Sequence, residues 1–306
     1  MKKKIYIIGF GKTGTSFYFE LKDKGYEVYF ISDKNAGSSE RLKNETSLLN
    51  FSDKIKKDFI KESDVILICV QDRYIKDAVN TIINFNTDLS KKIMIHVSGS
   101  VSTEVFERGS INPENTVSMH PIQTFDKISI ENNHLLEKIY FGIEGGHTGK
   151  EYAKEIIASF DSNFIEIPKD KKHLYHSACV VSSNFLITLL NISSEIMGSI
   201  GIEKNKTFEI FRPIIERTLE NISEDGLVNS LTGPFERNDL ETISNHLNSI
   251  NKELPSLIPF YTLLGMETVK VAFKKESINM KNVISVLDLM NEYIINESNS
   301  VNKTIN

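Results

Sequence analysis

A glycine-rich stretch near the start of the chain has the spacing of a dinucleotide-binding turn. Gly9, Gly11 and Gly14 form a GxGxxG pattern that follows a short apolar run, Lys4–Ile8, and opens a helical pattern. The first glycine allows a tight turn, the second lets the backbone approach a diphosphate, and the third permits close packing of helix on strand. Free N–H groups at the helix start would face the phosphates. The pattern predicts a dinucleotide cofactor; the alternative is a tight turn that binds nothing.

The residues around this loop bear on the kind of nucleotide. Gly11-Lys12-Thr13 contains the GKT of a P-loop, but Tyr6 stands where the P-loop needs glycine, which excludes it. Asp33, at the end of the second apolar run, would accept hydrogen bonds from the adenosine ribose and favours NAD. Lys34 and Arg41 could hold a 2′-phosphate if Asp33 turned away, so NADP stays open, and a simple polar turn is the alternative. The predicted cofactor residues are Gly9, Phe10, Gly11, Lys12, Thr13, Gly14, Ser32, Asp33, Lys34, Val70 and Gln71.

Several polar residues could move a proton or orient a substrate. His120 follows a predicted strand, and histidine changes charge near neutral pH. Ser98 follows another, where its hydroxyl would bind a ligand or cap the loop. Lys172, His176 and Asn184 share one face of a long helical pattern, opposite an apolar stripe that we expect to be buried, so we expect this polar face at a wet cleft between domains. For each histidine, the alternative is a hydrogen-bonded structural side chain.

Arg237 is a further candidate for substrate binding, whereas motifs for a metal site or a serine nucleophile do not occur. Arg237 lies in a loop broken by Gly233 and Pro234, and could clamp a substrate carboxylate or pair with Asp239 at the surface. No cysteine–histidine group has zinc-ligand spacing, and neither H-E-x-x-H nor G-x-S-x-G occurs. We therefore expect no metal site and no serine nucleophile.

The apolar patterning predicts how these residues are positioned. Nearly continuous apolar runs that alternate with helical patterns are typical of a parallel, doubly wound sheet. After residue 168 only helical patterns occur, so we predict a dinucleotide-binding Rossmann-like domain over residues 1–168 and a helical substrate and dimerisation domain over 169–306. The predicted strands are 4–8, 27–32, 64–70, 92–97, 116–119, 140–143 and 163–167, and the predicted helices are 13–24, 72–85, 169–200, 205–221, 239–251, 257–272 and 281–296.

Composition narrows the class of protein. With 306 residues, 40% hydrophobic and 25% charged, the chain has an ordinary globular composition. A net charge of −5 with no basic stripe argues against nucleic-acid binding. No apolar run is expected to span a bilayer, and the short run after the first lysines is interrupted too early for a signal peptide. We expect a cytoplasmic protein with reduced cysteines, a small-molecule partner, and neither nucleic acid nor membrane as a partner.

Several motifs occur together along the whole chain. Besides the glycine loop these are His96-Val97-Ser98-Gly99-Ser100, Met119-His120-Pro121-Ile122-Gln123-Thr124-Phe125, Tyr175-His176 with Asn184, and Leu231-Thr232-Gly233-Pro234 followed by Arg237, Asp239 and His246. On these the chain resembles the Rossmann-like proteins with a helical C-terminal domain of unknown function. That family is similar to pyrroline-5-carboxylate reductases, ketopantoate reductases, 3-hydroxyacid dehydrogenases and prephenate dehydrogenases.

The resemblance implies a fold, an activity and residue roles. It implies a helical domain like the C-terminal one of 6-phosphogluconate dehydrogenase and a homodimer formed through it. It implies that His120 with Pro121 touches an oxidised hydroxyl, as in prephenate dehydrogenases. By likeness to 3-hydroxyacid dehydrogenases, Lys172 or His176 would be the acid or base and Asn184 the orienting amide. Members usually carry an arginine where Asp33 stands here.

The expected function follows from these residues and this resemblance. We expect an NAD(P)-dependent oxidoreductase that transfers a hydride to or from a small polar metabolite. The alternatives are a non-catalytic dinucleotide-sensing or scaffold protein, and a prephenate-type biosynthetic dehydrogenase.

Overall fold

The computed structural model describes residues 2–35, 50–126 and 134–304, and the side chains up to residue 294. The chain forms two compact units, Met1–Phe185 and Leu186–Asn306. The long helix α6, Lys172–Ser199, runs from the first unit into the second. The domain boundary at residue 168 that the sequence predicts lies just ahead of this helix.

The first unit is built on one eight-stranded sheet with the order β3-β2-β1-β4-β5-β6-β7-β8. Neighbouring strands run parallel except β6 and β7, which are antiparallel. The strands are β1 (Lys4–Ile8), β2 (Glu27–Ser32), β3 (Asn50–Ser52), β4 (Val65–Ile68), β5 (Ile93–His96), β6 (Thr116–Pro121), β7 (Tyr140–Gly145) and β8 (Asn163–Glu166).

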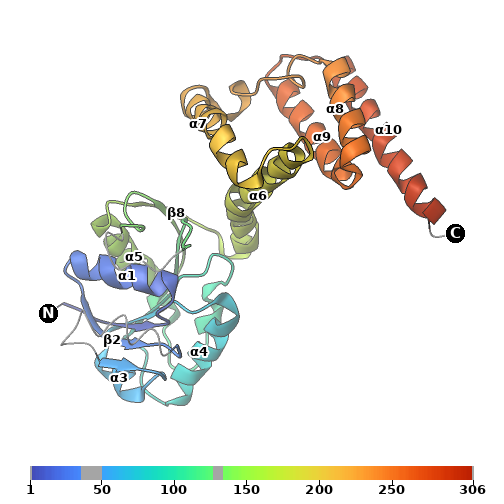
Figure 1. Ribbon diagram of the computed structural model, residues 1–306. Coiled ribbons are helices and arrows are strands. Elements are labelled where there is room, and N and C mark those ends of the chain that lie inside the picture. The colour runs from blue at the N-terminus through green and yellow to red at the C-terminus, as the bar shows by residue number, and fades with distance from the viewer. Residues whose placement is uncertain (1, 36–49, 127–133, 305–306) are drawn as a thin grey trace. The chain divides into compact units, whose positions relative to one another are not determined.

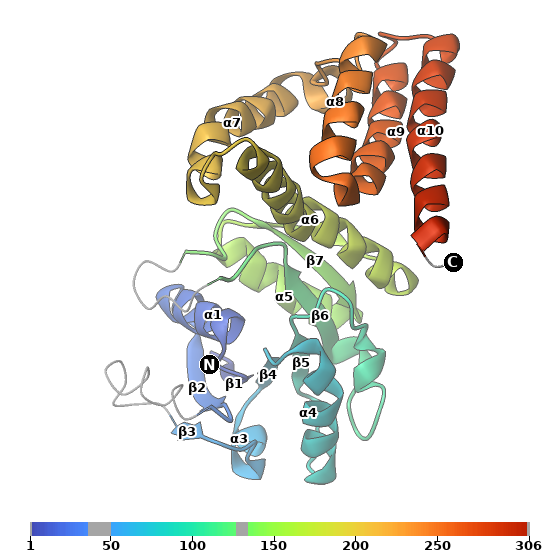
Figure 2. The same ribbon diagram turned by 45° about the vertical axis from the view of Figure 1, so that its right-hand side comes forward.

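Helices cover both faces of this sheet, which explains the continuous apolar runs of the central strands (Figures 1 and 2). Helices α1 (Lys12–Asp23) and α5 (His147–Ser159) lie on one face, over one buried cluster that includes Phe17 and Ile156. Helices α3 (Lys57–Glu62) and α4 (Asp72–Asn84) lie on the other, over a second cluster. The doubly wound fold that the sequence predicts is confirmed.

Two features of this unit differ from the sequence-based expectation. The sheet is mostly parallel rather than wholly so, because the chain turns back after β6 and the Ile122 N–H donates to the Tyr140 carbonyl. Strand β3 and helices α3 and α5 are additional elements. Strand β3 has three residues and α3 has six, too few to show a hydrophobic period.

The second unit contains helices only, within the residues that the structure describes, as the sequence predicts. They are the end of α6, then α7 (Lys204–Asn229), α8 (Leu240–Glu253), α9 (Ile258–Lys274) and α10 (Met280–Thr304). Helices α8, α9 and α10 share one buried core, which includes Leu247, Val269 and Met290. Helix α7 bends at Gly226, whose φ of 81° is outside the helical range.

Helix α6 differs from expectation in two ways. Its residues are numerous and apolar enough to span a membrane by length and composition, with a mean hydropathy of 1.3 over 18 residues. One such helix is a weak indication, and, unlike in a core helix of a soluble protein, none of this 18-residue window is buried. The apolar stripe that we expected to be buried is exposed instead, with Leu174 at 71%, Val181 at 56% and Phe185 at 54%.

Candidate functional site

The glycine loop between β1 and α1 has the geometry that a diphosphate requires. Gly9 has a φ of +95°, and a Cβ there would lie 2.8 Å from the backbone at Cys69 and Val70. A Cβ at Gly14 would collide with the Gly9 carbonyl oxygen, whereas one at Gly11 would meet nothing within 4 Å. The loop is therefore closely packed at Gly9 and Gly14, against itself and the residues that follow β4, and open at Gly11.

The start of α1 lacks the groups that usually satisfy a helix N-terminus. Gly11 is the N-cap, no side chain caps it, and the first turn contains no acidic residue. The N–H groups of a first turn have no partner within the helix and carry the positive end of its dipole. Lys12 and Thr13 stand here, beside the open position at Gly11. This chain's own residues thus fit a bound diphosphate.

Asp33 has a structural role that its sequence position did not reveal. One carboxylate oxygen accepts a hydrogen bond of 2.5 Å from the Phe10 N–H, and the other accepts one of 2.7 Å from the Asn35 N–H. The carboxylate thus ties the end of β2 to the glycine loop. A carboxylate has about four lone-pair sites, so this leaves capacity for ribose hydroxyls. Arg41, the alternative phosphate acceptor, lies outside the described residues.

The remaining predicted cofactor residues lie at the carboxyl ends of β2 and β4. Ser32 is buried, and its hydroxyl bonds to Tyr6 Oη at 2.6 Å and to the Lys54 carbonyl at 2.9 Å. Lys34 is exposed. Val70 is half-buried, and exposed Gln71 accepts a hydrogen bond from Arg73. Ser32 therefore serves the loop's packing, while Lys34 and Gln71 are accessible.

A histidine cluster, which we define as His120, Tyr175 and His176, lies at the carboxyl end of β6. His120 Nδ1 is 2.7 Å from Tyr175 Oη, and the rings of His120 and His176 are 5.9 Å apart. A Cβ at Gly99 would lie 2.7 Å from the His176 ring and 2.9 Å from the His120 ring. Both rings therefore pack against the bare backbone of the loop after β5.

The sheet register explains why Tyr175 reaches His120. His120 pairs with Gly142 of the antiparallel neighbour β7. A Cβ at Gly142 would collide with the Tyr175 hydroxyl, so the phenol ring occupies the space that a side chain would fill. The missing side chain on β7 thus admits a residue of α6 beside the histidine of β6.

Lys172 lies buried next to the histidine cluster. Its ammonium donates hydrogen bonds to Ser118 Oγ at 2.6 Å and to the Ser98 carbonyl at 3.3 Å, and the residue is 2% exposed. Ser118 also donates to the Ser98 carbonyl at 3.0 Å. The Ser98 hydroxyl accepts from the N–H groups of Ser100 and Val101. Ser98 therefore offers Lys172 its carbonyl, while its hydroxyl closes the turn.

Burial and neighbouring charges lower the pKa of three groups here. Burial, with the adjacent Lys172 ammonium, lowers the pKa of His96 to about 3. Burial, followed by His176 and Lys172, lowers the pKa of His120 to about 4. Burial lowers the pKa of Lys172 to about 8. The Asp72 carboxylate opposes all three shifts, and Ser100 Oγ donates to it at 2.7 Å. At neutral pH both imidazoles are neutral, and Lys172 carries the positive charge.

Two predicted residues stand apart from this group. Asn184 lies on α6 two turns beyond His176, about 12 Å further along the axis. Arg237 belongs to the second compact unit, in the loop before α8. Its neighbour Asp239 caps that helix by accepting hydrogen bonds from the Thr242 N–H and Oγ1. The first unit by itself thus brings together Ser98, His120, Lys172 and His176.

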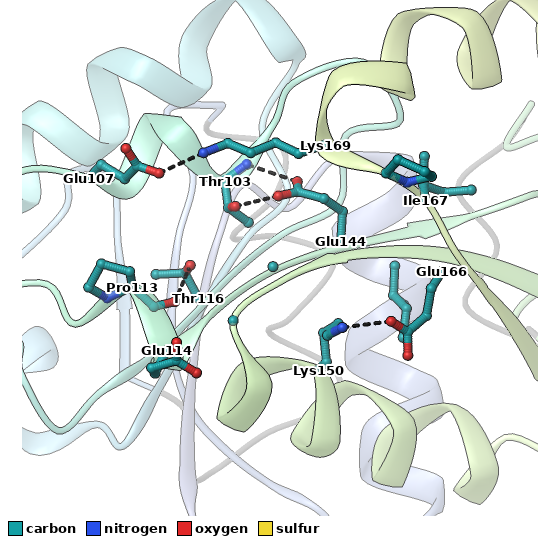
Figure 3. Close-up of a pocket in the computed structure, with 14 residues that line it drawn as sticks. Thr103, Glu107, Pro113, Glu114, Thr116, Glu144, Lys150, Glu166, Ile167 and Lys169 are labelled. Atoms are coloured by element: carbon teal, nitrogen blue, oxygen red, sulfur yellow. Dashed lines mark hydrogen bonds and ion pairs between the residues drawn. The ribbon is translucent and has the colours of Figure 1, made fainter.

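A cavity of about 470 Å³ lies at the opposite edge of the sheet, where β6 begins and β7 ends (Figure 3). Four of its charged side chains form two ion pairs: Lys169 with Glu107, and Lys150 with Glu166. Glu144 accepts hydrogen bonds from the Thr103 N–H and hydroxyl. Both lysines are thus paired with carboxylates, and Glu114, which also lines the cavity, accepts a hydrogen bond from the His147 N–H.

Sequence reasoning assigned no role to Tyr175, Ser118 or His96, although each contributes to the site. Tyr175 follows Lys172 by three residues and precedes Cys179 by four, a spacing that places them on one helical face. His96 and Ser118 sit directly beside each other on adjacent strands. The helical spacing could have revealed Tyr175, but the pairing of β5 with β6 needs the structure.

Two segments of the chain match family models. Residues 4–99 match the family model described as NADP oxidoreductase, coenzyme F420-dependent. Residues 139–268 match a domain of unknown function. The chain therefore combines an oxidoreductase-type N-terminal domain with that C-terminal domain, and the resemblance inferred from its motifs is confirmed. No match to the chain is found among curated proteins.

Solved structures share the fold over most of their length. A candidate NADP oxidoreductase from Bacteroides fragilis is 20% identical, with a TM-score of 0.69 over 88% of this chain and 98% of its own. A Plasmodium falciparum pyrroline carboxylate reductase with NADP bound is 14% identical, with a TM-score of 0.56 over 94% and 98%. An Aquifex aeolicus prephenate dehydrogenase bound to hydroxyphenyl propionate and NAD⁺ is 14% identical, with a TM-score of 0.52 over 89% and 99%. At these identities the likeness shows the fold.

Proposed function

We propose that this chain is an NAD(P)-dependent oxidoreductase that transfers a hydride to or from a small polar metabolite. One observation carries the proposal. A single compact unit holds an uncapped, glycine-lined helix start after β1 and a cluster of proton-handling side chains at the ends of β5 and β6. Ligands of such sheets bind beyond the carboxyl ends of the strands, where both features lie. A bound nicotinamide dinucleotide supplies the hydride donor or acceptor.

His120 is the group best placed to move the accompanying proton. Burial raises the pKa of Tyr175, so its phenol stays protonated, and His120 is neutral. When the phenol donates to Nδ1, Nε2 carries the ring proton and can donate to a substrate oxygen. When Nδ1 donates to the phenol, Nε2 is free to accept a proton. The contact between Tyr175 and His120 is therefore compatible with both tautomers of the imidazole, so Nε2 of His120 can either donate or accept the proton.

Lys172 is proposed to act on the site through the charge of its buried ammonium. Its ammonium points into the protein toward Ser118 and the Ser98 carbonyl. A buried positive charge at this point favours the neutral form of His120 and stabilises negative charge that develops on a substrate oxygen. Lys172 is thus an electrostatic element of the site rather than the group that touches the transferred proton.

Two features support different dinucleotides. The half-buried Asp33 carboxylate at the end of β2 favours NAD, since it would repel a ribose 2′-phosphate. The family model and the Plasmodium neighbour are named for NADP. Asp33→Asn removes the charge and keeps an oxygen for the Phe10 N–H. We expect this variant to gain affinity for NADPH relative to NADH, and an unchanged ratio would remove the basis for choosing NAD.

Fluorescence titration with NADH and NADPH tests the cofactor proposal. We expect saturable binding that Gly11→Asp abolishes, because a carboxylate would enter the open position beside the loop. Asn84→Asp adds the same charge at an exposed position at the end of α4 and should bind like the unchanged protein. Binding that survives Gly11→Asp, or no binding at all, contradicts the proposal.

Turnover separates an enzyme from a sensor. A screen of 2-oxo, 3-oxo and imino acids with both reduced cofactors should show oxidation of one of them. Cofactor binding without turnover on any substrate class would favour the non-catalytic sensing alternative. Turnover of prephenate with NAD⁺ would favour the biosynthetic dehydrogenase alternative.

We also propose that the chain is a cytoplasmic homodimer. Several apolar side chains of α6 and α7 are strongly exposed in the single chain; they include Ile187, Ile214 and Leu219. Large apolar side chains exposed in such number are typical of an interaction site. A second copy of the chain would cover it by the same surface on both partners. The two cysteines, which are free, are in keeping with a reducing compartment.

A further inference from the structure

One buried side chain outside the proposed hydride site, the Glu20 carboxyl, accepts no hydrogen bond from the described residues, and burial together with the neighbouring Glu137 carboxylate raises its pKa to about 7. The Glu20 side chain is 1% exposed and projects from the last turns of α1, about 12 Å along the helix from Lys12. Buried polar groups are nearly always hydrogen-bonded, and an unsatisfied one calls for an explanation such as a bound ion.

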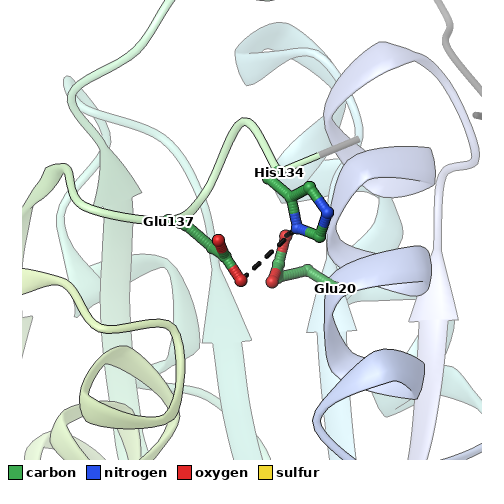
Figure 4. A group of neighbouring side chains, drawn as sticks. All are labelled: Glu20, His134 and Glu137. Atoms are coloured by element: carbon green, nitrogen blue, oxygen red, sulfur yellow. Dashed lines mark ion pairs between the residues drawn. The ribbon is translucent and has the colours of Figure 1, made fainter. Parts of the chain in front are cut away.

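Two other potential ligands face this carboxylate (Figure 4). His134 and Glu137 lie in the segment that leads into β7. His134 Nδ1 is 3.9 Å from Glu20 Oε2 and 3.4 Å from Glu137 Oε1. The three ligand atoms lie within 4.8 Å of one another. They come from two segments more than 100 residues apart, so the fold and not local sequence assembles them.

The distances from His134 to the two carboxylates are close to those around a small tetrahedral cation, and the two carboxylates lie within 4.8 Å of each other. Zinc binds imidazole nitrogen and carboxylate oxygen at about 2.0–2.2 Å, which places tetrahedral ligands about 3.3–3.6 Å apart. The two distances from His134 Nδ1 are 3.4 and 3.9 Å, at and slightly above that range. An imidazole also favours zinc over calcium and magnesium, which take oxygen ligands.

Lys24 is the cation that lies beside these carboxylates in the structure. Its ammonium is 2.5 Å from Glu137 Oε1 but 3.7 Å from Glu20 Oε1, too far to donate a hydrogen bond to Glu20. The Lys24 side chain is 25% exposed, and the acceptor Asp23 lies 3.6 Å from it. Lys24 therefore donates a hydrogen bond to Glu137 and forms only longer ion pairs with buried Glu20 and with exposed Asp23.

We propose that Glu20, His134 and Glu137 form a binding site for a divalent transition metal of the zinc class, with water as the fourth ligand. Lys24 competes with the metal and moves toward Asp23 when the metal binds. The metal ties the end of α1 to the segment entering β7. None of these residues belongs to the glycine loop or the histidine cluster, so the site is independent of the proposed hydride chemistry.

Calorimetric titration of the full chain with ZnCl₂ tests this. We expect one zinc per chain with a micromolar dissociation constant. Glu20→Gln and His134→Ala should each weaken binding by more than the roughly tenfold that loss of an outer-shell partner costs, because each alters a direct ligand. Lys24→Met should strengthen it by removing the competing cation. His147→Ala removes an exposed histidine on α5 and should change nothing.

The outcomes are decisive because the readout is metal binding and not activity. His134 is exposed, so its alanine variant keeps the core intact, and circular dichroism verifies the fold of each variant. The proposal is overturned if neither the unchanged chain nor Lys24→Met binds zinc saturably. It is also overturned if Glu20→Gln and His134→Ala bind as tightly as the His147→Ala control, or if calcium binds in preference to zinc.

Discussion

The hydroxyl of Tyr175 lies 2.7 Å from Nδ1 of His120, joining the first turns of α6 to the end of β6. This contact fixes which nitrogen of the imidazole remains for a ligand. It also links the helical pattern after residue 168 directly to the sheet. The proton-handling group of the proposed reaction is therefore oriented by a residue on another element.

Replacing Tyr175 by Phe tests that orientation. We expect turnover to fall by about two- to tenfold, because His120 loses one hydrogen bond at its Nδ1, worth about 0.5–1.5 kcal/mol, while dinucleotide affinity stays the same. The pH profile of turnover should also shift, since the hydrogen bond no longer biases the ring nitrogen. Tyr140→Phe removes an exposed hydroxyl on β7 and serves as the control. Identical pH profiles for all three proteins would count against a positioning role.

His120 and His176 can be ranked by matched substitutions. We expect His120→Asn to lower turnover by about 10²–10⁴-fold, the usual contribution of a general acid or base. His176→Asn should have a smaller effect, since its ring packs against Gly99 without an equivalent partner in the cluster. Steady-state kinetics at saturating cofactor measure both. A larger loss in His176→Asn would transfer the proton-carrying role to α6.

The glycine loop gives opposite expectations for two alanine variants. Gly14→Ala should destabilise the fold by about 1–3 kcal/mol, because its Cβ collides with the Gly9 carbonyl. Gly11→Ala should leave stability nearly unchanged but weaken dinucleotide binding, because its Cβ points into open space. Urea unfolding and NADH titration distinguish the two effects. Equal destabilisation by both would show that the loop is uniformly packed.

His96 makes stability depend on pH. Its pKa is about 3 in the folded chain and near 6.5 when unfolded, so the unfolded state binds more protons between these values. The free energy of unfolding should therefore fall as pH decreases from 6.5 toward 3, by up to about 1.4 kcal/mol per pH unit for this group. His120 contributes in the same direction. In His96→Asn, the free energy of unfolding measured in urea should depend less on pH. An unchanged pH dependence would mean that other groups cause it.

The molar mass in solution tests whether the exposed apolar side chains of α6 and α7 form a dimer interface. We expect the chain to be dimeric in light scattering and Ile214→Asp to yield a monomer, since a buried charge opposes association. Lys206→Glu changes an exposed charge on α7 and should remain dimeric. A monomer at micromolar concentration that floats with lipid vesicles would instead favour a membrane as the covering surface.

The fold was largely predictable because parallel strands covered on both faces leave a plain signal. The runs that became β1, β4 and β5 are continuous and apolar, and Gly9 to Gly14 mark the turn after the first. The reversal of β7 left no such signal, because an antiparallel strand that is also covered on both faces has the same composition.

The site was predictable only in part, since sequence places residues on elements but does not set register. His120, Lys172 and His176 were identified as candidates, and the structure brings them together. Their arrangement depends on the pairing of β6 with β7 and on where α6 meets the sheet. Likewise, the role of Asp33 in fastening Phe10 is a tertiary contact over 23 residues, which no local pattern encodes.

Gly142 sits in the middle of β7, where strand propensity alone would welcome a valine or an isoleucine. The phenol ring of Tyr175 reverses that preference, because even the methyl group of alanine at position 142 would displace the ring. A saturation scan of β7 should therefore find this position intolerant of any replacement, although it lies in none of the motifs that suggested the chemistry. Gly142 matters because it has no side chain: the space that a Cβ would fill is occupied by the ring of Tyr175, 33 residues further along the chain.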